Sequence, residues 1–337
     1  MLGISQKVKE VYGYTADAIP RDIIDSKSPI IFKGLIQNWP LVAAGLTSDA
    51  TADAYLRTFY NGRPVVEYFG PPEIEGRYFY NSDFTGLNFE SHTTPLTQVL
   101  DKIFKHHTDA LPPCFYIGST SVDTWLPGFR QHNDLALNTQ NPLVSIWIGN
   151  ASRIACHYDT SDNMACVAVG KRRFTLFPPE QVGNLYPGPI DFTPSGQAIS
   201  LVDFSAPDYE KFPRFREALK HAQVAEMEAG DALFLPSMWW HNVEALSRFN
   251  VLVNYWWTSV PAYSGNAIDA LKHAMLSVRD LPSDQKAAWK SLFDYYIFAA
   301  PEQAQEHIPP QACGSLAPTD EIGARKLRAW LINKLNR

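Results

Sequence analysis

Two separated histidines and one aspartate could together bind a divalent metal ion. His157 and Asp159 stand in the fragment His157-Tyr158-Asp159, and His241 ends the fragment Trp239-Trp240-His241 far downstream. Two imidazoles and one carboxylate leave coordination positions open for substrate and oxygen, the arrangement that non-haem Fe(II) sites prefer. This chemistry requires that the two fragments meet in the fold.

The pattern His-x-Asp does not by itself single out His157, because the chain contains it three times. The copy at 107–109 closes an expected helix and the copy at 132–134 lies in a polar loop, so we expect both on a solvated surface. The copy at 157–159 lies between two apolar runs, and residues i and i+2 of an extended chain project to the same side. The structural alternative for His157 is a core histidine bonded to a neighbouring acid, and His241 could equally be a lone structural histidine.

The elements that must position these residues form a β-rich core. From residue 114 to 257, short β runs alternate with turn residues, a pattern typical of a sandwich or barrel. The expected strands of this core are 114–117, 143–149, 163–169, 172–177, 231–235, 240–246 and 249–257. Before it we expect strands at 29–32 and 64–69 and helices at 49–60 and 95–106.

Three regions follow from these patterns. Residues 1–110 form a mixed α+β region that packs on the barrel, and residues 111–260 form the core. Within the core, residues 178–224 form a long insertion that we interpret as a wall or lid, with a short helix at 213–221.

Residues 261–337 are expected to be helical, at 267–281, 283–298 and 319–335. The last of these helices carries an apolar stripe of Leu327, Trp330, Leu331 and Leu335. Such a helix often docks on the body of a protein or on a second subunit, so we expect this region to form a homodimer.

Composition narrows the classes of partner. The chain has 337 residues, 45% of them hydrophobic, a net charge of -6 and no dense Lys/Arg block, so we expect no nucleic-acid partner. There is no run of about 18 apolar residues, which argues against a membrane partner. The N-terminus has no signal-peptide pattern and the four cysteines have no C-x-x-C spacing, so a cytoplasmic location is the default expectation.

Several further motifs stand in a fixed order around the histidines. They are His157-Tyr158-Asp159, Asn163, Gly170, Phe177-Pro178-Pro179-Glu180-Gln181, Leu185-Tyr186-Pro187, Val202-Asp203-Phe204, Pro207-Asp208-Tyr209-Glu210, Gly230-Asp231, Trp239-Trp240-His241 and Val253-Asn254-Tyr255-Trp256. Together they resemble the JmjC/cupin-like Fe(II)- and 2-oxoglutarate-dependent oxygenases, most closely the group of the asparaginyl hydroxylase that inhibits hypoxia-inducible factor. The resemblance covers less than half of the chain.

The resemblance implies a double-stranded β-helix (jelly-roll or cupin fold) whose mouth holds Fe(II). His157, Asp159 and His241 would be the ligands, and 2-oxoglutarate would be the cosubstrate. By motif position, the residues that would bind it are Tyr116, Asn163, Asn254 and Trp256. Tyr116 and Trp256 could equally be core aromatic residues, and Asn254 could satisfy a strand end.

The chain departs from the family pattern at two positions. Arg172 stands where the family lysine pairs with the far carboxylate of the cosubstrate. Period two places Arg172 with Phe174 on one strand face, so Arg172 is the better inward candidate than Arg173. A guanidinium grips a carboxylate through two hydrogen bonds but is bulkier than an ammonium group. A different small acid could therefore be preferred at this position. A separate alternative is that the basic run at 171–173 is a solvated hairpin turn.

The second departure is Ile154, which replaces a threonine and removes one hydroxyl group from the expected cosubstrate site.

The activity implied by the resemblance is hydroxylation of a protein side chain or small molecule, coupled to oxidative decarboxylation of 2-oxoglutarate to succinate. A homodimer is implied as well, and no chromatin-reading motif favours histone demethylation. Two other interpretations stay open. One is a metal-binding cupin that acts as a non-catalytic sensor or small-acid-binding module, and the other is a structural protein with an accidental triad.

Overall fold

The computed structural model describes residues 2–137 and 140–336. The chain divides into two compact units, Met1–Thr258 and Ser259–Arg337. The first unit is built on β-sheets and the second is helical.

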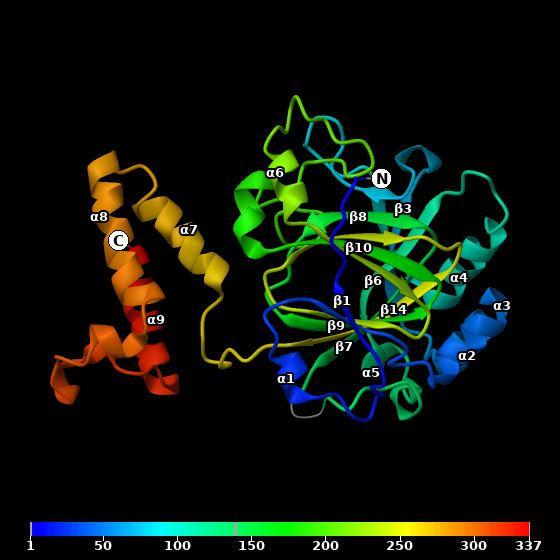
Figure 1. Cartoon of the computed structure of the whole chain (residues 1–337), viewed down its shortest axis with the longest axis horizontal. Helices are drawn as coiled ribbons and strands as arrows, with labels where there is room; N and C mark the ends of the chain where they lie inside the picture. The colour runs from blue at the N-terminus through cyan, green and yellow to red at the C-terminus, as the bar shows by residue number, and fades with distance from the viewer. Residues whose placement is uncertain (1, 138–139, 337) are drawn as a thin grey trace. The chain divides into compact units, whose positions relative to one another are not determined.

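Two sheets form the first unit (Figure 1). Among the described residues, the larger sheet has nine strands in the order β1-β2-β12-β9-β14-β7-β6-β3-β5, and the smaller has five in the order β11-β10-β13-β8-β4. The strands are β1 Lys9–Val11, β2 Ile30–Phe32, β3 Pro64–Gly70, β4 Arg77–Tyr78, β5 Glu90–Pro95, β6 Cys114–Ser121, β7 Leu143–Gly149, β8 Ser152–His157, β9 Asp162–Val169, β10 Lys171–Phe177, β11 Gln223–Glu228, β12 Ala232–Leu235, β13 Trp240–Ala245 and β14 Asn250–Trp257.

The strands β7 to β14 are distributed over two facing sheets. β7, β9, β12 and β14 lie in the larger sheet, whereas β8, β10, β11 and β13 lie in the smaller. The chain therefore passes repeatedly from one sheet to the other, as in a double-stranded β-helix. The expected fold class, mainly β with flanking helices on a cupin or jelly-roll core, is confirmed. The two sheets stay open and do not close into a barrel.

Alternating side chains divide the apolar residues of β9 between two cores. Met164 and Cys166 pack into the cluster on the outer face of the larger sheet, while Ala165 and Val167 pack between the two sheets. Because both faces are covered, the strand is apolar along nearly its whole length. Helices α2 (Pro40–Thr47), α3 (Asp49–Phe59) and α4 (Leu96–Lys105) contribute the residues that cover the outer face.

The N-terminal strands extend the two sheets. β2 pairs with β12, β3 pairs with β6, and β4 pairs in parallel with β8. The first hundred residues are therefore hydrogen-bonded to the core through both sheets. Two short helices, α1 (Arg21–Ile24) and α5 (Val122–Trp125), complete this part of the unit.

The long segment between β10 and β11 contains little regular structure. It holds a 3₁₀ helix at Pro179–Asn184 and the helix α6 at Phe215–Lys220, inside the range expected for a short helix. Its apolar side chains form a separate hydrophobic cluster that includes Leu185, Phe212 and Phe215. The segment is thus packed rather than loose.

The prediction that residues 132–134 lie on a solvated surface is wrong for Asn133. Its side chain is fully buried, accepts a hydrogen bond from the Leu41 backbone N–H and donates to the Phe129 carbonyl. Asp134 accepts a hydrogen bond from the Tyr255 hydroxyl. The polar residues of this loop tie α2 and β14 together, which the sequence pattern did not indicate.

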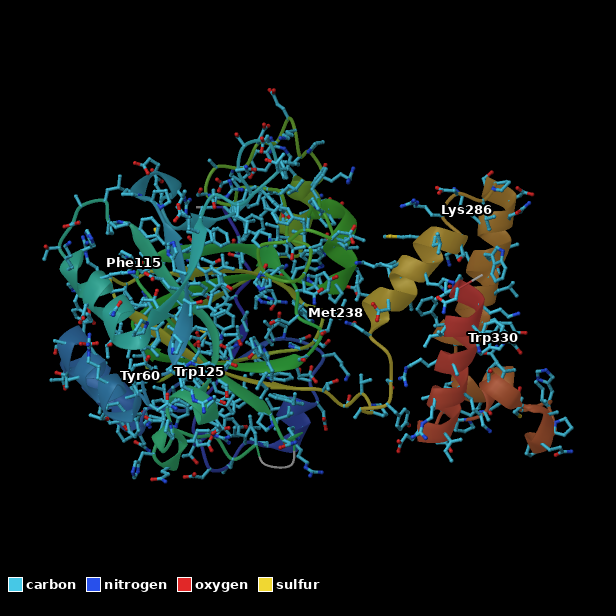
Figure 2. The ribbon with its side chains drawn as sticks, turned by 180° about the vertical axis from the view of Figure 1, so that it is seen from behind. Tyr60, Phe115, Trp125, Met238, Lys286 and Trp330 are labelled. Carbon is cyan, nitrogen blue, oxygen red and sulfur yellow. The ribbon has the colours of Figure 1, made fainter. Side chains whose placement is uncertain are left out.

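The second unit contains α7 (Ala267–Ser277), α8 (Ser283–Phe293) and α9 (Glu321–Leu335). The helix expected at 283–298 ends its α-helical part at Phe293 and continues as one π-helical turn, Asp294–Phe298. Figure 2 labels Lys286 on α8 and Trp330 on α9. No helix in the described part of the chain is both long and apolar enough to cross a bilayer.

Candidate metal centre

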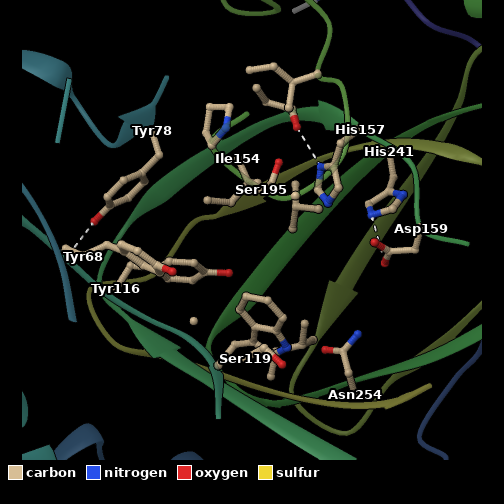
Figure 3. A pocket seen from close by; sticks show the side chains of 18 of the residues that line it. Tyr68, Tyr78, Tyr116, Ser119, Ile154, His157, Asp159, Ser195, His241 and Asn254 are labelled. Carbon is tan, nitrogen blue, oxygen red and sulfur yellow. Dashed lines mark hydrogen bonds and ion pairs between the residues drawn. The ribbon is translucent and has the colours of Figure 1, made fainter. Parts of the chain in front are cut away.

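His157 and His241 are brought together by strand pairing. β8 and β13 are antiparallel neighbours, and their register places His241 directly opposite His157. The imidazole centroids are 4.3 Å apart, and Asp159 Oδ2 lies 3.8 Å from His241 Nε2. One ligand atom from each of the three residues lies within 4.8 Å of the other two. Figure 3 shows the three side chains converging at one end of a pocket.

Each imidazole is oriented by the backbone carbonyl two residues earlier. His157 Nδ1 lies 2.9 Å from the Ala155 oxygen, and His241 Nδ1 lies 3.0 Å from the Trp239 oxygen. Because a carbonyl can only accept, both Nδ1 atoms carry the proton and both Nε2 lone pairs are free for a metal. Burial, and then the neighbouring His157, lowers the pKa of His241 to about 4, so its imidazole is neutral at pH 7. A neutral imidazole is the form that binds a metal.

A tight turn before β13 fixes this end of the two strands. Met238 has a left-handed backbone (φ 69°), and its N–H donates to the Asp159 carbonyl at 2.8 Å. The Ser237 N–H donates to Asp162 Oδ1, and the Ser237 hydroxyl donates to the Thr160 carbonyl. The turn therefore clamps the segment that carries Asp159 to the segment that carries His241.

A cavity of about 390 Å³ opens beside the three residues, between the two sheets. All eight side chains selected from the sequence line it. They are Tyr116, His157, Asp159, Asn163, Arg172, His241, Asn254 and Trp256. The cavity lies wholly within the first unit.

Arg172 is buried in this cavity, and no acidic side chain in the described part of the chain forms an ion pair with it. It is 2% exposed and lies on the same strand face as Phe174, whereas Arg173 lies on the other face and contacts Glu226 at 3.0 Å. Burial lowers the pKa of Arg172, and its buried Nε atom has no hydrogen-bond partner among the described residues. A buried cation without a partner is costly, so an anionic ligand would be strongly favoured here.

The two asparagines are bonded to each other. Asn254 Nδ2 donates to Asn163 Oδ1 at 2.8 Å, and Asn254 Oδ1 has no partner among the described residues. Tyr116 lies close to Arg172, and burial raises the pKa of its phenol, so the hydroxyl stays protonated and can donate. In Figure 3 the ring of Tyr116 extends from the side of Tyr68 and Tyr78 toward the metal-binding end.

Several lining residues were missed from the sequence. Tyr68, Tyr78, Trp147 and Ser195 all line the cavity. Tyr68 and Tyr78 come from N-terminal strands that carry no motif, and Ser195 comes from the insertion. Trp147 lies in a strand with large apolar side chains on both faces, so periodicity did not show which side chains point inward. Ile154 lines the cavity as well, where the resemblance led us to expect a threonine.

The residues fit both implied ligands. Two Nε2 atoms and one carboxylate, all close together, match a divalent first-row metal with open positions. The unpartnered guanidinium on the wall of the same cavity matches a carboxylate.

Comparisons with known proteins give the family. A model of the cupin-like domain matches residues 16–263. The chain is 32% identical over 313 residues to chicken (Gallus gallus) tRNA wybutosine-synthesizing protein 5, covering 83% of this chain and 91% of the relative. It is 36% identical over 117 residues to Lysine-specific demethylase JMJ31 of Arabidopsis thaliana, covering 34% of this chain and 21% of the relative. It is also 36% identical over 114 residues to HSPB1-associated protein 1 of Bos taurus, covering 33% and 23%.

The chain thus spans about a fifth of the demethylase and of the HSPB1-associated protein, but nearly all of the chicken protein. These similarities do not show a particular closeness to the asparaginyl hydroxylases. Strands β2 to β14 lie inside the matched range, together with the three candidate metal ligands. The chain belongs to the cupin-like (JmjC-type) domain family.

Proposed function

We propose that this protein is an Fe(II)- and 2-oxoglutarate-dependent oxygenase. One observation carries the proposal: the metal-binding triad and a buried arginine without a partner line the same cavity. A metal site alone would suit many functions. The buried arginine in the same cavity has no counter-ion among the described residues. This supports binding of an acid whose one end contacts the metal and whose other end contacts the arginine.

In this proposal, the metal binds at one end of the cavity and the far carboxylate of the cosubstrate at the other. His157, Asp159 and His241 would hold Fe(II), which when bound supplies the activation of O₂ that oxidises 2-oxoglutarate to succinate and CO₂. Arg172 would bind the far carboxylate, with Tyr116 donating a second hydrogen bond. Asn163, Asn254 and Trp256 would border the cosubstrate. The aromatic walls exclude water from the reacting atoms.

The substrate that accepts the second oxygen atom is a protein side chain or a small molecule in this proposal. The similarity to a relative named as a demethylase supports a protein substrate, although the match covers 21% of that relative. Hydroxylation is the reaction that we propose. A cytoplasmic location remains our expectation for the protein.

A nucleoside carried by RNA is a second candidate substrate. The relative named as a tRNA wybutosine-synthesizing protein favours it, because 91% of its length is covered. The net charge of -6 opposes it, since an RNA backbone favours basic surfaces. Comparing succinate release with tRNA and with a peptide mixture as added substrate would separate the two.

The test is turnover. Protein loaded with Fe(II) without oxygen, then given 2-oxoglutarate and O₂, is expected to release succinate even without a second substrate. A His157→Ala variant supplies the background rate. If the protein neither releases succinate nor binds 2-oxoglutarate, the proposal is contradicted. A non-catalytic metal-binding module is then the better hypothesis.

We further propose that the second unit forms a homodimer. None of its three α-helices has a buried residue, and large apolar side chains are exposed, including Leu276 (76%), Phe298 (76%) and Trp330 (57%). In the described part of this unit, Ala304 and Cys313 alone are buried. Exposed apolar surface of this extent supports association with a partner, and we propose a second copy of the chain.

A further inference from the structure

Polar atoms without partners gather at the cavity. Among the described residues, five buried side-chain polar atoms have no hydrogen-bond partner. Four of them belong to residues that line the cavity: Trp147 Nε1, Arg172 Nε, Asn254 Oδ1 and Trp256 Nε1. Buried polar groups are almost always hydrogen-bonded, so this concentration marks a place where a ligand completes the bonding.

Three of these four atoms are donors. An indole N–H and a guanidinium N–H can only donate, so they require acceptors on the ligand. The sequence predicts Arg172 and Trp256 in the site because of their places in the family motifs, and for Arg172 also because of the strand period. Trp147 was not selected at all, and neither the proposed function nor the family match gives it a role.

Trp147 is held firmly next to Tyr116. The two rings are stacked, with centroids 5.7 Å apart and planes inclined by 28°, and Trp256 meets Trp147 edge-on at 5.7 Å. Gly118 lies next to both aromatic groups: a Cβ atom there would clash with the Tyr68 ring at 2.8 Å and would be in ordinary contact with the Trp147 ring at 3.7 Å. The indole therefore occupies one place, and its N–H is fixed in the wall.

Tyr116 connects this tryptophan to the arginine. Tyr116 and Arg172 line the same cavity, and the ring of Tyr116 lies against Trp147. A carboxylate bound by Arg172 and Tyr116 would thus lie beside the indole as well. Carboxylate oxygens have several lone pairs and can accept from all of these donors.

We propose that Trp147 is a positioning residue for the dicarboxylic acid, with its Nε1–H donating to the bound acid and its ring holding Tyr116 in place. This inference rests on the proposed function, since it concerns the acid that the oxygenase would use. It adds a specificity element: because Trp147 and Arg172 line the same cavity, we expect the indole to limit the length of the acid that can bind.

The test is equilibrium binding of 2-oxoglutarate to the Mn(II)-loaded protein, measured by titration calorimetry without oxygen. Trp147→Phe keeps an aromatic ring against Tyr116 but removes the N–H. The loss of one hydrogen bond to a charged acceptor is expected to raise the Kd for 2-oxoglutarate about tenfold or more. The Kd for Mn(II) is expected to stay within about twofold, because the triad is untouched.

Trp289→Phe is the matched control, because Trp289 is an exposed tryptophan on α8 outside the cavity. Its affinity for 2-oxoglutarate should equal that of the natural protein. A second titration uses 2-oxoadipate, which is one carbon longer than 2-oxoglutarate. Trp147→Leu is expected to gain affinity for 2-oxoadipate relative to 2-oxoglutarate if the indole sets the length of the acid.

Nuclear magnetic resonance provides a readout that does not need the phenylalanine variant to fold. In Zn(II)-loaded protein with ¹⁵N-labelled tryptophan, adding 2-oxoglutarate is expected to shift the Trp147 indole signal downfield. The signal is assigned with Trp147→Tyr.

The outcomes separate the two proposals. If the natural protein binds no 2-oxoglutarate, the proposed function fails. If it binds the acid but Trp147→Phe binds it equally well, or if the indole signal does not move, the role of Trp147 alone is overturned.

Discussion

The two imidazoles of the candidate metal centre are prepared by their own backbones. In each case Nδ1 donates to the carbonyl two residues earlier, at 2.9 Å for His157 and 3.0 Å for His241. This geometry fixes the tautomer and the ring direction before any metal arrives. Asp159 completes the donor set from the turn that follows β8.

Replacing His157 by alanine should remove the metal. Two remaining ligands hold a divalent ion far more weakly than three, so we expect the Kd for Mn(II) to rise by roughly 100-fold or more. Titration calorimetry or metal analysis after dialysis would measure this. His132→Ala is the control, because His132 is the exposed histidine of another His-x-Asp copy. Unchanged metal content in His157→Ala would mean that the triad is accidental.

Arg172 should show opposite effects on ligand binding and on stability. In Arg172→Met, the charge-assisted bonds to the acid are lost, and we expect 2-oxoglutarate to bind roughly 10- to 100-fold more weakly. The same variant removes a buried cation without a partner, so the ligand-free protein should become more stable, by about 1–3 kcal/mol.

Urea unfolding and calorimetry measure the two effects. Arg173→Met serves as control, because Arg173 lies on the outer face of the same strand and pairs with Glu226. Arg172→Lys is expected to restore part of the affinity, since it keeps the charge but loses the two-pronged geometry. Destabilisation of Arg172→Met together with unchanged affinity would show that Arg172 is a structural residue.

At the scale of elements, strands were predicted most accurately where the sequence contains a clear apolar run. β7 was predicted with its observed bounds, and β9, β10 and β14 to within one residue. β8 and β11 were not predicted as strands. β8 is only partly buried, and in β11 the acids Glu226 and Glu228 break up a short apolar pattern. Their pairing with distant strands, rather than local preference, makes them strands.

The candidate site also has residues that the sequence predicts and residues that it does not. His157, Asp159 and His241 could be found because two motifs carry them. Tyr68 and Tyr78 could not, because they reach the cavity only when β3 and β4 join the two sheets. The sequences of β3 and β4 contain no pattern that indicates which strands they pair with. Long-range strand pairing is therefore what separates the predicted from the unpredicted part of the wall.

The turn between β9 and β10 depends on one glycine. Gly170 has a left-handed backbone (φ 81°), and a Cβ atom there would lie 2.5 Å from Asn250 Oδ1 and 2.7 Å from the Phe249 carbonyl. Gly170→Ala must therefore shift the backbone of the turn that delivers Arg172. We expect a loss of about 2 kcal/mol or more in the free energy of unfolding by urea, with an unchanged m-value.

Gly183→Ala is the matched control, because no atom lies within 4 Å of its added Cβ and its backbone is not left-handed. We expect that variant to unfold within about 0.5 kcal/mol of the natural protein. Equal stability of the two variants would show that the turn at Gly170 tolerates a side chain.

At the scale of the whole molecule, the two units differ in how they bury apolar side chains. The first has a continuous core on the larger sheet and a second one between the sheets. The second unit leaves tryptophan, phenylalanine and leucine side chains exposed on its helices. A helical unit of 79 residues without a core is not expected to be stable alone, so its apolar faces need a partner.

A chain of 37.9 kDa should therefore appear at about twice that mass by size-exclusion chromatography with light scattering. Placing a charge in the apolar stripe of α9, in Trp330→Glu, should shift the protein toward the monomer, because a buried unpaired carboxylate is costly at an interface. Lys326→Glu on the same helix is the control, since it introduces the same carboxylate at a position that is already charged and exposed. A natural protein that stays monomeric at tens of micromolar would contradict the homodimer. If Trp330→Glu remains a dimer, the interface does not include this stripe. Metal binding should be unchanged in both variants, because the triad lies within the first unit.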